Sequence, residues 1–197
     1  MSYLHKNGII HRNLNPNNIY MDNNLYPKIS NFGLAKRTKD LNLDDTMPEL
    51  VYDAPEILEG EDYSEASDVY SYGMILYQII TCLKSFKSSN SIFHTSTRIT
   101  RGERPEISPN TPAIYSQLIK RCWSQNSYER PTFNEILSLL REDSGYLLQD
   151  GSVDQDEIKR YIELVDNALS SPNNEFSKPK ESQKRKVTTK ILPDFSK

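Results

Sequence analysis

Cysteine, glycine and long apolar runs are scarce in this sequence of 197 residues, and each scarcity excludes a class of protein. The two cysteines, Cys82 and Cys122, are too few and too far apart for a disulfide framework or a metal knot, so we expect two reduced thiols in the core. With 7 glycines against 11 prolines, the chain is not a fibrous or repeat protein. The longest apolar run, residues 73–82, is about half of the ~20 residues that a bilayer crossing needs. No membrane association is expected, and without a signal-peptide pattern at the N-terminus we expect the cytoplasm.

Charge is unevenly distributed along the sequence. Residues 170–197 hold 7 basic and 3 acidic residues, net +4, which leaves a net charge of -7 for residues 1–169. The basic stretch Lys178–Lys190, centred on Lys184-Arg185-Lys186, is typical of a nuclear-import or nucleic-acid element, so a nuclear location is the alternative to the cytoplasm. No aromatic residues are interleaved with these cations, and the acidic body would repel phosphates. We therefore expect a disordered tail over residues 170–197 and no nucleic-acid partner.

The spacing of apolar residues predicts a mainly α fold with one small β-hairpin. Two short strands are expected between residues 9 and 29, on either side of an Asp-Asn-Asn turn at residues 22–24. The stretch Ser64–Leu83 is apolar enough in its second half to predict a helix buried on every side. Residues 1–8 are predicted to be the end of a helix that Gly8 closes. Further helices are predicted over Ala113–Trp123, Phe133–Leu140 and Asp154–Leu169. We expect a lobe over residues 1–142, a helical extension over 143–169 and the tail over 170–197.

Several short motifs occur in one order along residues 1–142. The run His11-Arg12-Asn13-Leu14-Asn15-Pro16-Asn17-Asn18 resembles the H-R-D-L-K-P-x-N catalytic loop of protein kinases, and Lys28–Ala35 resembles the K-I-x-D-F-G-L-A that follows it. The remaining similar segments are Tyr52–Glu56, Ser67–Gly73, Gly102–Pro105, Cys122-Trp123 and Arg130–Phe133. The resemblance is to the tyrosine-kinase-like branch, and it implies the mainly α C-terminal lobe of a kinase.

The resemblance begins at the end of the helix that precedes the catalytic loop. We therefore expect the N-terminal lobe to be absent, together with the Gly-rich loop and the lysine that cover and pair the ATP phosphates in the family. ATP and Mg²⁺ are the cofactors that the family resemblance implies. With half of the nucleotide site missing, we expect no cofactor for this chain.

Four polar positions of the catalytic motifs differ from the family. Asn13 stands where the family has the base that accepts the substrate proton, and Asn15 where the serine/threonine branch has a lysine facing the phosphate. Asn31 replaces the magnesium-binding aspartate of D-F-G. Asn18 matches the second metal ligand, so Asn18 and Asn31 are weak candidate metal positions. A gapless alignment also puts Glu49 where that branch has a substrate-loop threonine.

The positions that hold the family lobe together are retained. The resemblance implies an ion pair between Glu56 and Arg130, and it implies that Asp68 accepts backbone N–H groups of the catalytic loop. Trp123 is expected to fill the core, while His5 and His94 are expected on the surface. The other positions with an expected structural role are His11, Arg12, Phe32 and Gly33. Arg12 is also a candidate partner for a phosphate on Thr38 or Thr46.

Two functions compete on these residues. The first is a pseudokinase lobe that binds other proteins, either as a scaffold or by meeting an N-terminal lobe on another chain. The second is a fragment of an active tyrosine-kinase-like serine/threonine kinase, which would transfer phosphate from ATP. The first is favoured because the structural positions are retained while the chemical ones are lost. Partner, substrate and oligomeric state are not encoded in any motif of this sequence.

Overall fold

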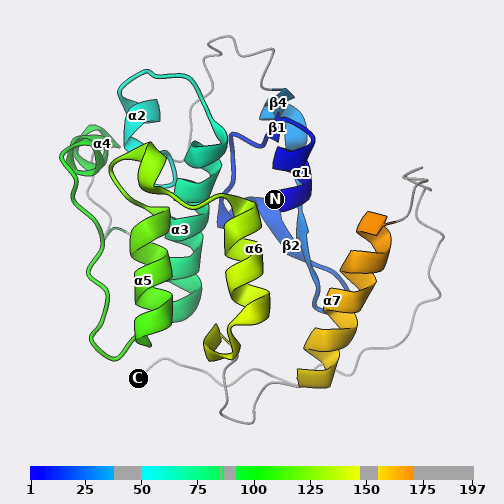
Figure 1. Ribbon diagram of the computed structural model, residues 1–197. Coiled ribbons are helices and arrows are strands. Elements are labelled where there is room, and N and C mark those ends of the chain that lie inside the picture. The colour runs from blue at the N-terminus through cyan, green and yellow to red at the C-terminus, as the bar shows by residue number, and fades with distance from the viewer. Residues whose placement is uncertain (38–49, 85, 87–91, 147–154, 171–197) are drawn as a thin grey trace. The chain divides into compact units, whose positions relative to one another are not determined.

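The computed structural model describes residues 1–37, 50–84, 86, 92–146 and 155–170 (Figure 1). Thr38, Thr46, Glu49 and the basic tail fall outside these ranges. The chain divides into two units, Met1–Val153 and Asp154–Lys197. The first unit is mainly helical with short antiparallel strands, which confirms the predicted fold class.

Helix α3, Glu65–Thr81, lies at the centre of the first unit. Its start is fixed by a capping box, in which Ser64 caps the backbone of Ser67 while the Ser67 hydroxyl bonds the backbone of Ser64. Tyr70 and Met74 are fully buried in its middle, which confirms the predicted core helix. The expectation of burial on every side is wrong for the last turn, because Ile79 is 65% exposed.

Helices α5, Ala113–Cys122, and α6, Phe133–Glu142, pack beside α3 and confirm two further predictions (Figure 1). The approach of α5 to α3 is close: a Cβ added at Gly73 would lie 2.8 Å from the Cβ of Cys122. Cys122 is buried as expected, whereas Cys82 is exposed, so the prediction of two core thiols is wrong for Cys82.

Two helices were not predicted from the sequence. They are α2, Pro55–Leu58, and α4, Ile92–Thr100. Helix α4 is rich in threonine, which has a low helix propensity, so its local sequence gives little helical signal. Ile99 and Thr95 are buried against the rest of the lobe. Tertiary packing therefore decides the conformation of α4.

The predicted hairpin consists of β2, Ile19–Met21, and β3, Pro27–Ile29, with Tyr20 opposite Lys28. Its turn is closed by Asp22, whose Oδ1 accepts the backbone N–H groups of Asn24 and Tyr26, both at 2.9 Å. A second small sheet was not predicted: β1, Ile9–Ile10, pairs with β4, Lys36–Arg37. These two sheets flank the segment that resembles the catalytic loop.

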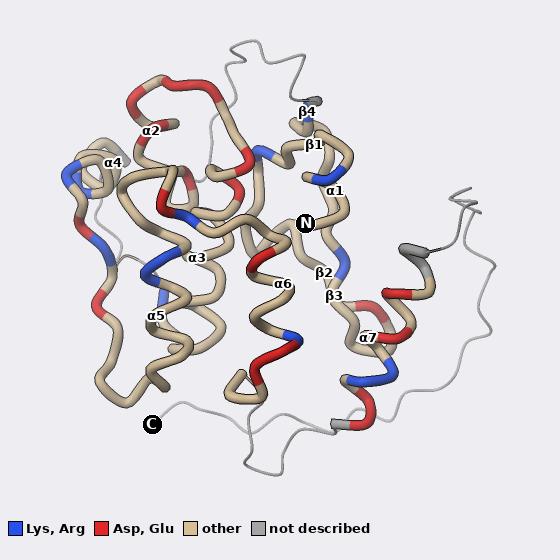
Figure 2. The backbone as a smooth tube through the Cα atoms, viewed as in Figure 1, with Lys and Arg blue, Asp and Glu red and all other residues tan. Residues whose placement is uncertain are grey.

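The N-terminal helix α1, Ser2–Lys6, is followed by Gly8 in the left-handed region, at φ 67°, as the sequence predicts. In the second unit, α7 covers Gln155–Ser170, and the helix predicted there is confirmed. None of the described helices combines the length and the apolar character that a bilayer crossing requires. Figure 2 shows that acidic residues gather between α2 and the start of α3.

Candidate functional site

The loop from His11 to Asn18 joins β1 to β2 and ends in the 3-10 turn η1, Pro16–Asn18. Asp68 of α3 anchors this loop through hydrogen bonds to its backbone. Asp68 is 1% exposed, and its carboxylate accepts the backbone N–H of His11 at 2.8 Å and of Arg12 at 2.9 Å. Arg12 has φ 66°, in the left-handed region that is unfavourable for a residue with a side chain. The two hydrogen bonds to a buried carboxylate therefore hold the loop in a strained shape.

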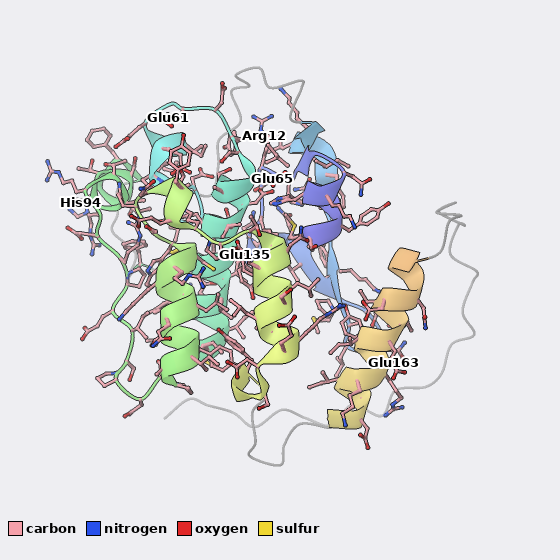
Figure 3. The ribbon with its side chains drawn as sticks, viewed as in Figure 1. Arg12, Glu61, Glu65, His94, Glu135 and Glu163 are labelled. Atoms are coloured by element: carbon pink, nitrogen blue, oxygen red, sulfur yellow. The ribbon has the colours of Figure 1, made fainter. Side chains whose placement is uncertain are left out.

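His5 is a third partner of Asp68. Its Nε2 lies 2.8 Å from Asp68 Oδ2, and the residue is 9% exposed. The expectation of a surface position is therefore wrong for His5, because a partner 63 positions away gives no signal in the local sequence. His94, by contrast, is exposed on α4, as expected (Figure 3).

The four asparagines that replace or accompany the family's chemical residues lie together and bond to one another. Asn15 Nδ2 donates to Asn13 Oδ1 at 2.8 Å, and Asn18 Nδ2 donates to the Asn13 carbonyl at 2.7 Å. Asn31 Nδ2 donates to Asn18 Oδ1 at 3.1 Å. Asn15 and Asn18 are buried, so these bonds satisfy amides that have little access to water. We call this set the asparagine cluster.

Asn15 also has a structural task. Its Oδ1 accepts the backbone N–H of Asn17 at 2.9 Å and so caps η1. Both ends of the Asn15 amide are thus engaged inside the loop. In this position the side chain is a cap and not a group directed at a phosphate.

The donor set of the asparagine cluster does not fit Mg²⁺. Hard divalent cations prefer anionic oxygens, and the cluster contains no carboxylate. The side-chain oxygens of Asn13 and Asn18 each already accept an N–H from a neighbouring amide. Within the described ranges, no three His, Cys, Asp or Glu side chains are grouped as metal ligands would be. The neutral amides of Asn31 and Asn18 form a direct hydrogen bond with each other. Two side-chain oxygens that faced each other would instead need a cation or a proton between them.

Asn31 opens the turn η2, Phe32–Leu34, with φ 62°. Phe32 is 47% exposed, and its ring meets the His11 ring edge-on at 5.2 Å. His11 is fully buried, and its Nε2 lies 3.0 Å from the Ser30 carbonyl. A Cβ added at Gly33 would meet nothing closer than 3.6 Å. His11 therefore connects the catalytic-like loop to η2, through the ring contact with Phe32 and the hydrogen bond to Ser30 just before η2.

Arg12 and Asp53 are two buried ionisable side chains that both act electrostatically on Tyr63. The Arg12 guanidinium lies 4.5 Å from the centre of the Tyr63 ring, and its Nη1 is 3.5 Å from the Leu34 carbonyl. Two buried atoms, Arg12 Nε and Asp53 Oδ2, have no hydrogen-bond partner in the described part of the chain. Burial raises the pKa of Asp53 to about 7. Burial, followed by the nearby Asp53 charge, raises the pKa of Tyr63 to about 12.

Asp53 is the site residue that sequence reasoning missed. It stands inside the Tyr52–Glu56 segment, and the motif resemblance of that segment gives it no role. Acidic side chains are rarely buried without a partner, so composition gives no reason to place this one inside. Its relative exposure is 7%.

Glu56 and Arg130 form a two-pronged ion pair. Arg130 Nη1 and Nη2 lie 2.5 Å and 2.7 Å from the two carboxylate oxygens of Glu56. Arg130 also donates to the carbonyls of Ala66 and Ser124, at 3.0 Å and 2.9 Å, so its buried charge is well satisfied. Trp123 is 5% exposed and lies in the core.

Comparison with known proteins assigns residues 1–140 to the model of a family described as protein tyrosine and serine/threonine kinase. A probable serine/threonine-protein kinase of Dictyostelium discoideum is 37% identical over 143 residues, which are 72% of this chain and 16% of that protein. A serine/threonine/tyrosine-protein kinase of Arabidopsis thaliana is 32% identical over 143 residues, 72% of this chain and 37% of the relative. A putative serine/threonine-protein kinase/receptor of Acanthamoeba polyphaga mimivirus is 32% identical, and the match covers 9% of its length. The chain thus matches well under two thirds of each of these relatives.

Proposed function

The chain belongs to the protein tyrosine and serine/threonine kinase family, and from that premise we propose that it is a catalytically inactive kinase lobe that binds other proteins. The observation that carries the proposal is the asparagine cluster. Its amides bond to one another at the positions where the family has a base, a phosphate-facing lysine and metal ligands. This arrangement is stable without a cation and has no acidic or basic group to offer to a substrate.

The first chemical consequence concerns proton transfer. An amide oxygen has no useful basicity, and the loss of a general base typically costs about 10²- to 10⁴-fold in rate. The side-chain oxygen of Asn13 in addition accepts the amide N–H of Asn15. A substrate hydroxyl that approached Asn13 would meet a neutral oxygen that is already engaged.

The second consequence concerns ATP and Mg²⁺, which family membership implies as the cofactors of active relatives. When bound, the metal supplies charge stabilisation for the transferred phosphoryl group. Asn18 and Asn31 are the residues that would face it, and both are neutral. The proposal therefore assigns no cofactor to this chain.

The retained framework supports the binding part of the proposal. Asp68 still fixes the loop backbone, and the buried pair of Glu56 and Arg130 still ties α2 to the segment before α6. A lobe that keeps such contacts presents a defined surface, which is what protein recognition requires. We further propose that the protein acts in the cytoplasm. The two cysteines Cys82 and Cys122 form no disulfide, as is usual in that reducing compartment.

A second candidate function is a part of an active serine/threonine kinase. The observation that favours it is the short match, which covers 9% to 37% of the three relatives described above. On this proposal, groups outside the 197 residues would supply the metal affinity and the nucleotide contacts. The two proposals differ in whether the asparagine cluster takes part in phosphate transfer.

Phosphate transfer by the chain itself tests the proposed inactivity directly. The complete 197-residue chain is incubated with ATP, Mg²⁺ and myelin basic protein, beside an Asn18→Ala variant and a mock preparation. We expect no transfer above the mock level. If the unmodified chain transfers phosphate and the Asn18→Ala variant does not, the proposal of an inactive lobe is wrong and the kinase alternative is right.

Calorimetric titration with Mg²⁺ gives a second readout that does not depend on a substrate. We expect no binding by the unmodified chain, and measurable binding once Asn13→Asp/Asn31→Asp places two carboxylates at the site. Mg²⁺ binding by the unmodified chain that is lost in the Asn18→Ala variant would show that the asparagine cluster does hold the metal.

A further inference from the structure

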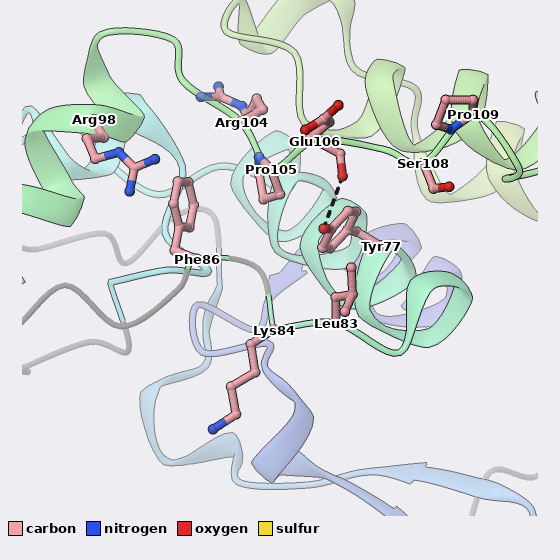
Figure 4. A pocket seen from close by; sticks show the side chains of 10 residues that line it. All are labelled: Tyr77, Leu83, Lys84, Phe86, Arg98, Arg104, Pro105, Glu106, Ser108 and Pro109. Atoms are coloured by element: carbon pink, nitrogen blue, oxygen red, sulfur yellow. Dashed lines mark hydrogen bonds between the residues drawn. The ribbon is translucent and has the colours of Figure 1, made fainter. Parts of the chain in front are cut away.

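A groove of about 680 Å³ lies between the end of α3, Phe86, α4 and the segment 104–109 (Figure 4). None of the residues that line it belongs to the asparagine cluster. Its volume falls within the range of 300–1,000 Å³ typical of ligand-binding clefts. The groove is therefore large enough to take two or three side chains of a peptide.

One wall of the groove is apolar and held in place. Tyr77 is 3% exposed, and its hydroxyl donates to the Glu106 carbonyl at 3.2 Å, as Figure 4 shows. The segment that is bonded to Tyr77 contributes Pro105 and Pro109 to the lining, and their rings fix the backbone φ angle. A site whose walls are already ordered loses little conformational entropy when a ligand binds.

Apolar surface is also offered at the mouth of the groove. Leu83 is 56% exposed although it is a large aliphatic residue. Phe86 is half-buried and lies 5.1 Å below the Arg98 guanidinium. Burial of one aliphatic or aromatic ligand side chain against these residues is favourable in proportion to the apolar area removed from water.

The charge of the lining is opposite to that of the surrounding body. The groove is lined by three cations, Lys84, Arg98 and Arg104, and by one carboxylate, Glu106. Residues 1–153, which form the first unit, hold 15 basic and 19 acidic residues, a net charge of -4. A positive groove on an acidic body favours an acidic partner and opposes a basic one.

The three cations are not equally available. Arg98 pairs with Glu103, with 2.5 Å between Arg98 Nε and the carboxylate. Arg104 donates to the carbonyls of Trp123 and Ile99, at 2.9 Å and 3.1 Å, and is thereby part of the lobe's own structure. Lys84 is exposed and has no ion pair among the described residues. It is the cation that remains for a ligand carboxylate.

We propose that this groove binds a peptide segment in which an aliphatic or aromatic side chain stands next to one or more carboxylates. The apolar side chain lies on Leu83 and Phe86, beside the buried Tyr77, and the carboxylate pairs with Lys84. This inference rests on the proposed function as a binding module and names the class of partner.

Selection from a random peptide library displayed on phage, with the complete 197-residue chain immobilised, tests the proposal. We expect enriched sequences with Asp or Glu adjacent to Phe, Leu or Tyr. Binding of an enriched, fluorescein-labelled peptide is then measured by anisotropy. Leu83→Ser should weaken it at least about tenfold, because the buried apolar area is lost. Lys84→Glu should weaken it about three- to tenfold, more at low than at high salt.

The matched control is Lys120→Glu, the same charge change at an exposed position on α5 outside the groove. It should leave the affinity within about twofold. Both groove variants change exposed side chains, and unchanged far-UV circular dichroism establishes that they fold.

Three results would overturn the proposal: no enriched sequence, enrichment of basic peptides, or equal binding by the unmodified chain and both groove variants. If the chain self-associates in sedimentation experiments and Leu83→Ser abolishes this self-association, the groove instead binds a second copy of the chain. None of these outcomes bears on phosphate transfer. The groove proposal and the inactive-lobe proposal can therefore fail independently of each other.

Discussion

Asp53 offers a direct test of how burial controls the stability of this lobe. Its carboxyl is 7% exposed, and Oδ2 has no hydrogen-bond partner in the described part of the chain. The charged groups that act on the same tyrosines as Asp53 are Arg12 and Asp68 at Tyr63, and Arg104, Arg130 and Glu56 at Tyr70. Arg12 lies over the Tyr63 ring and is not within ion-pair distance of Asp53. The ionised carboxylate is therefore unfavourable in the folded state.

The size and sign of the effect follow from the pKa values. Burial raises the pKa of Asp53 from 3.8 to about 7 in the folded chain. Between these two values the folded state holds a proton that the unfolded state has released, so the free energy of unfolding falls as the pH rises. At about 1.4 kcal/mol for each pKa unit, the full loss amounts to about 4 kcal/mol and is complete above the folded pKa.

Asp53→Asn removes this dependence, because the amide has nearly the same shape and does not titrate. We expect the variant to be close to the unmodified chain at pH 4 and more stable by up to about 4 kcal/mol at pH 8. Urea unfolding at pH 4, 5, 6, 7 and 8, followed by the fluorescence of Trp123, measures the difference. Trp123 is the one tryptophan of the chain and is buried.

Asp62→Asn is the matched control, since Asp62 is an exposed carboxylate nearby in the sequence. The difference between this control and the unmodified chain should not change with pH. A difference between Asp53→Asn and the unmodified chain that stays constant from pH 4 to 8 would refute the reasoning. So would a variant that is less stable at pH 8.

Three further predictions concern stability, each measured by urea unfolding at neutral pH. Glu56→Gln leaves the buried Arg130 charge without its counter-ion and should lower the free energy of unfolding by about 3–5 kcal/mol. Cys82→Gly should raise it by about 0.5–1 kcal/mol, because Cys82 ends α3 with φ 54°, a conformation that glycine adopts without strain. Gly73→Ala should lower it by about 1–3 kcal/mol, because the new Cβ would lie 2.8 Å from that of Cys122.

Two of these changes, Glu56→Gln and Gly73→Ala, have a control of the same kind. Glu103→Gln breaks the exposed pair with Arg98 and should cost less than about 1 kcal/mol. A loss as large as that of Glu56→Gln would show that burial is not what makes the inner pair important. Gly33→Ala adds a Cβ whose nearest neighbour is 3.6 Å away, and it should be tolerated where Gly73→Ala is not. A destabilised Cys82→Gly would show that the left-handed residue is not strained.

Much of the fold could be predicted from the sequence because its signals are local. The apolar stretch of α3, the Asp22 turn of the hairpin and Gly8 after α1 each depend on residues close together in the chain. Family membership likewise followed from short motifs in order, and so did the loss of carboxylates at Asn13 and Asn31. The second sheet and α4 could not be predicted, because distant contacts and not local propensity decide them.

The candidate site shows the same division. The sequence by itself determined that Asn13, Asn15, Asn18 and Asn31 stand in the motifs that resemble the catalytic loop and the segment after it. The tertiary structure alone decided that these amides satisfy one another, and that His5 is buried against Asp68. It likewise placed Asp53 inside the lobe, with no hydrogen-bond partner for its Oδ2 among the described residues, and left Lys84 exposed in the lining of the groove. Burial and pairing depend on residues far apart in the chain, so they arise only when the chain is folded.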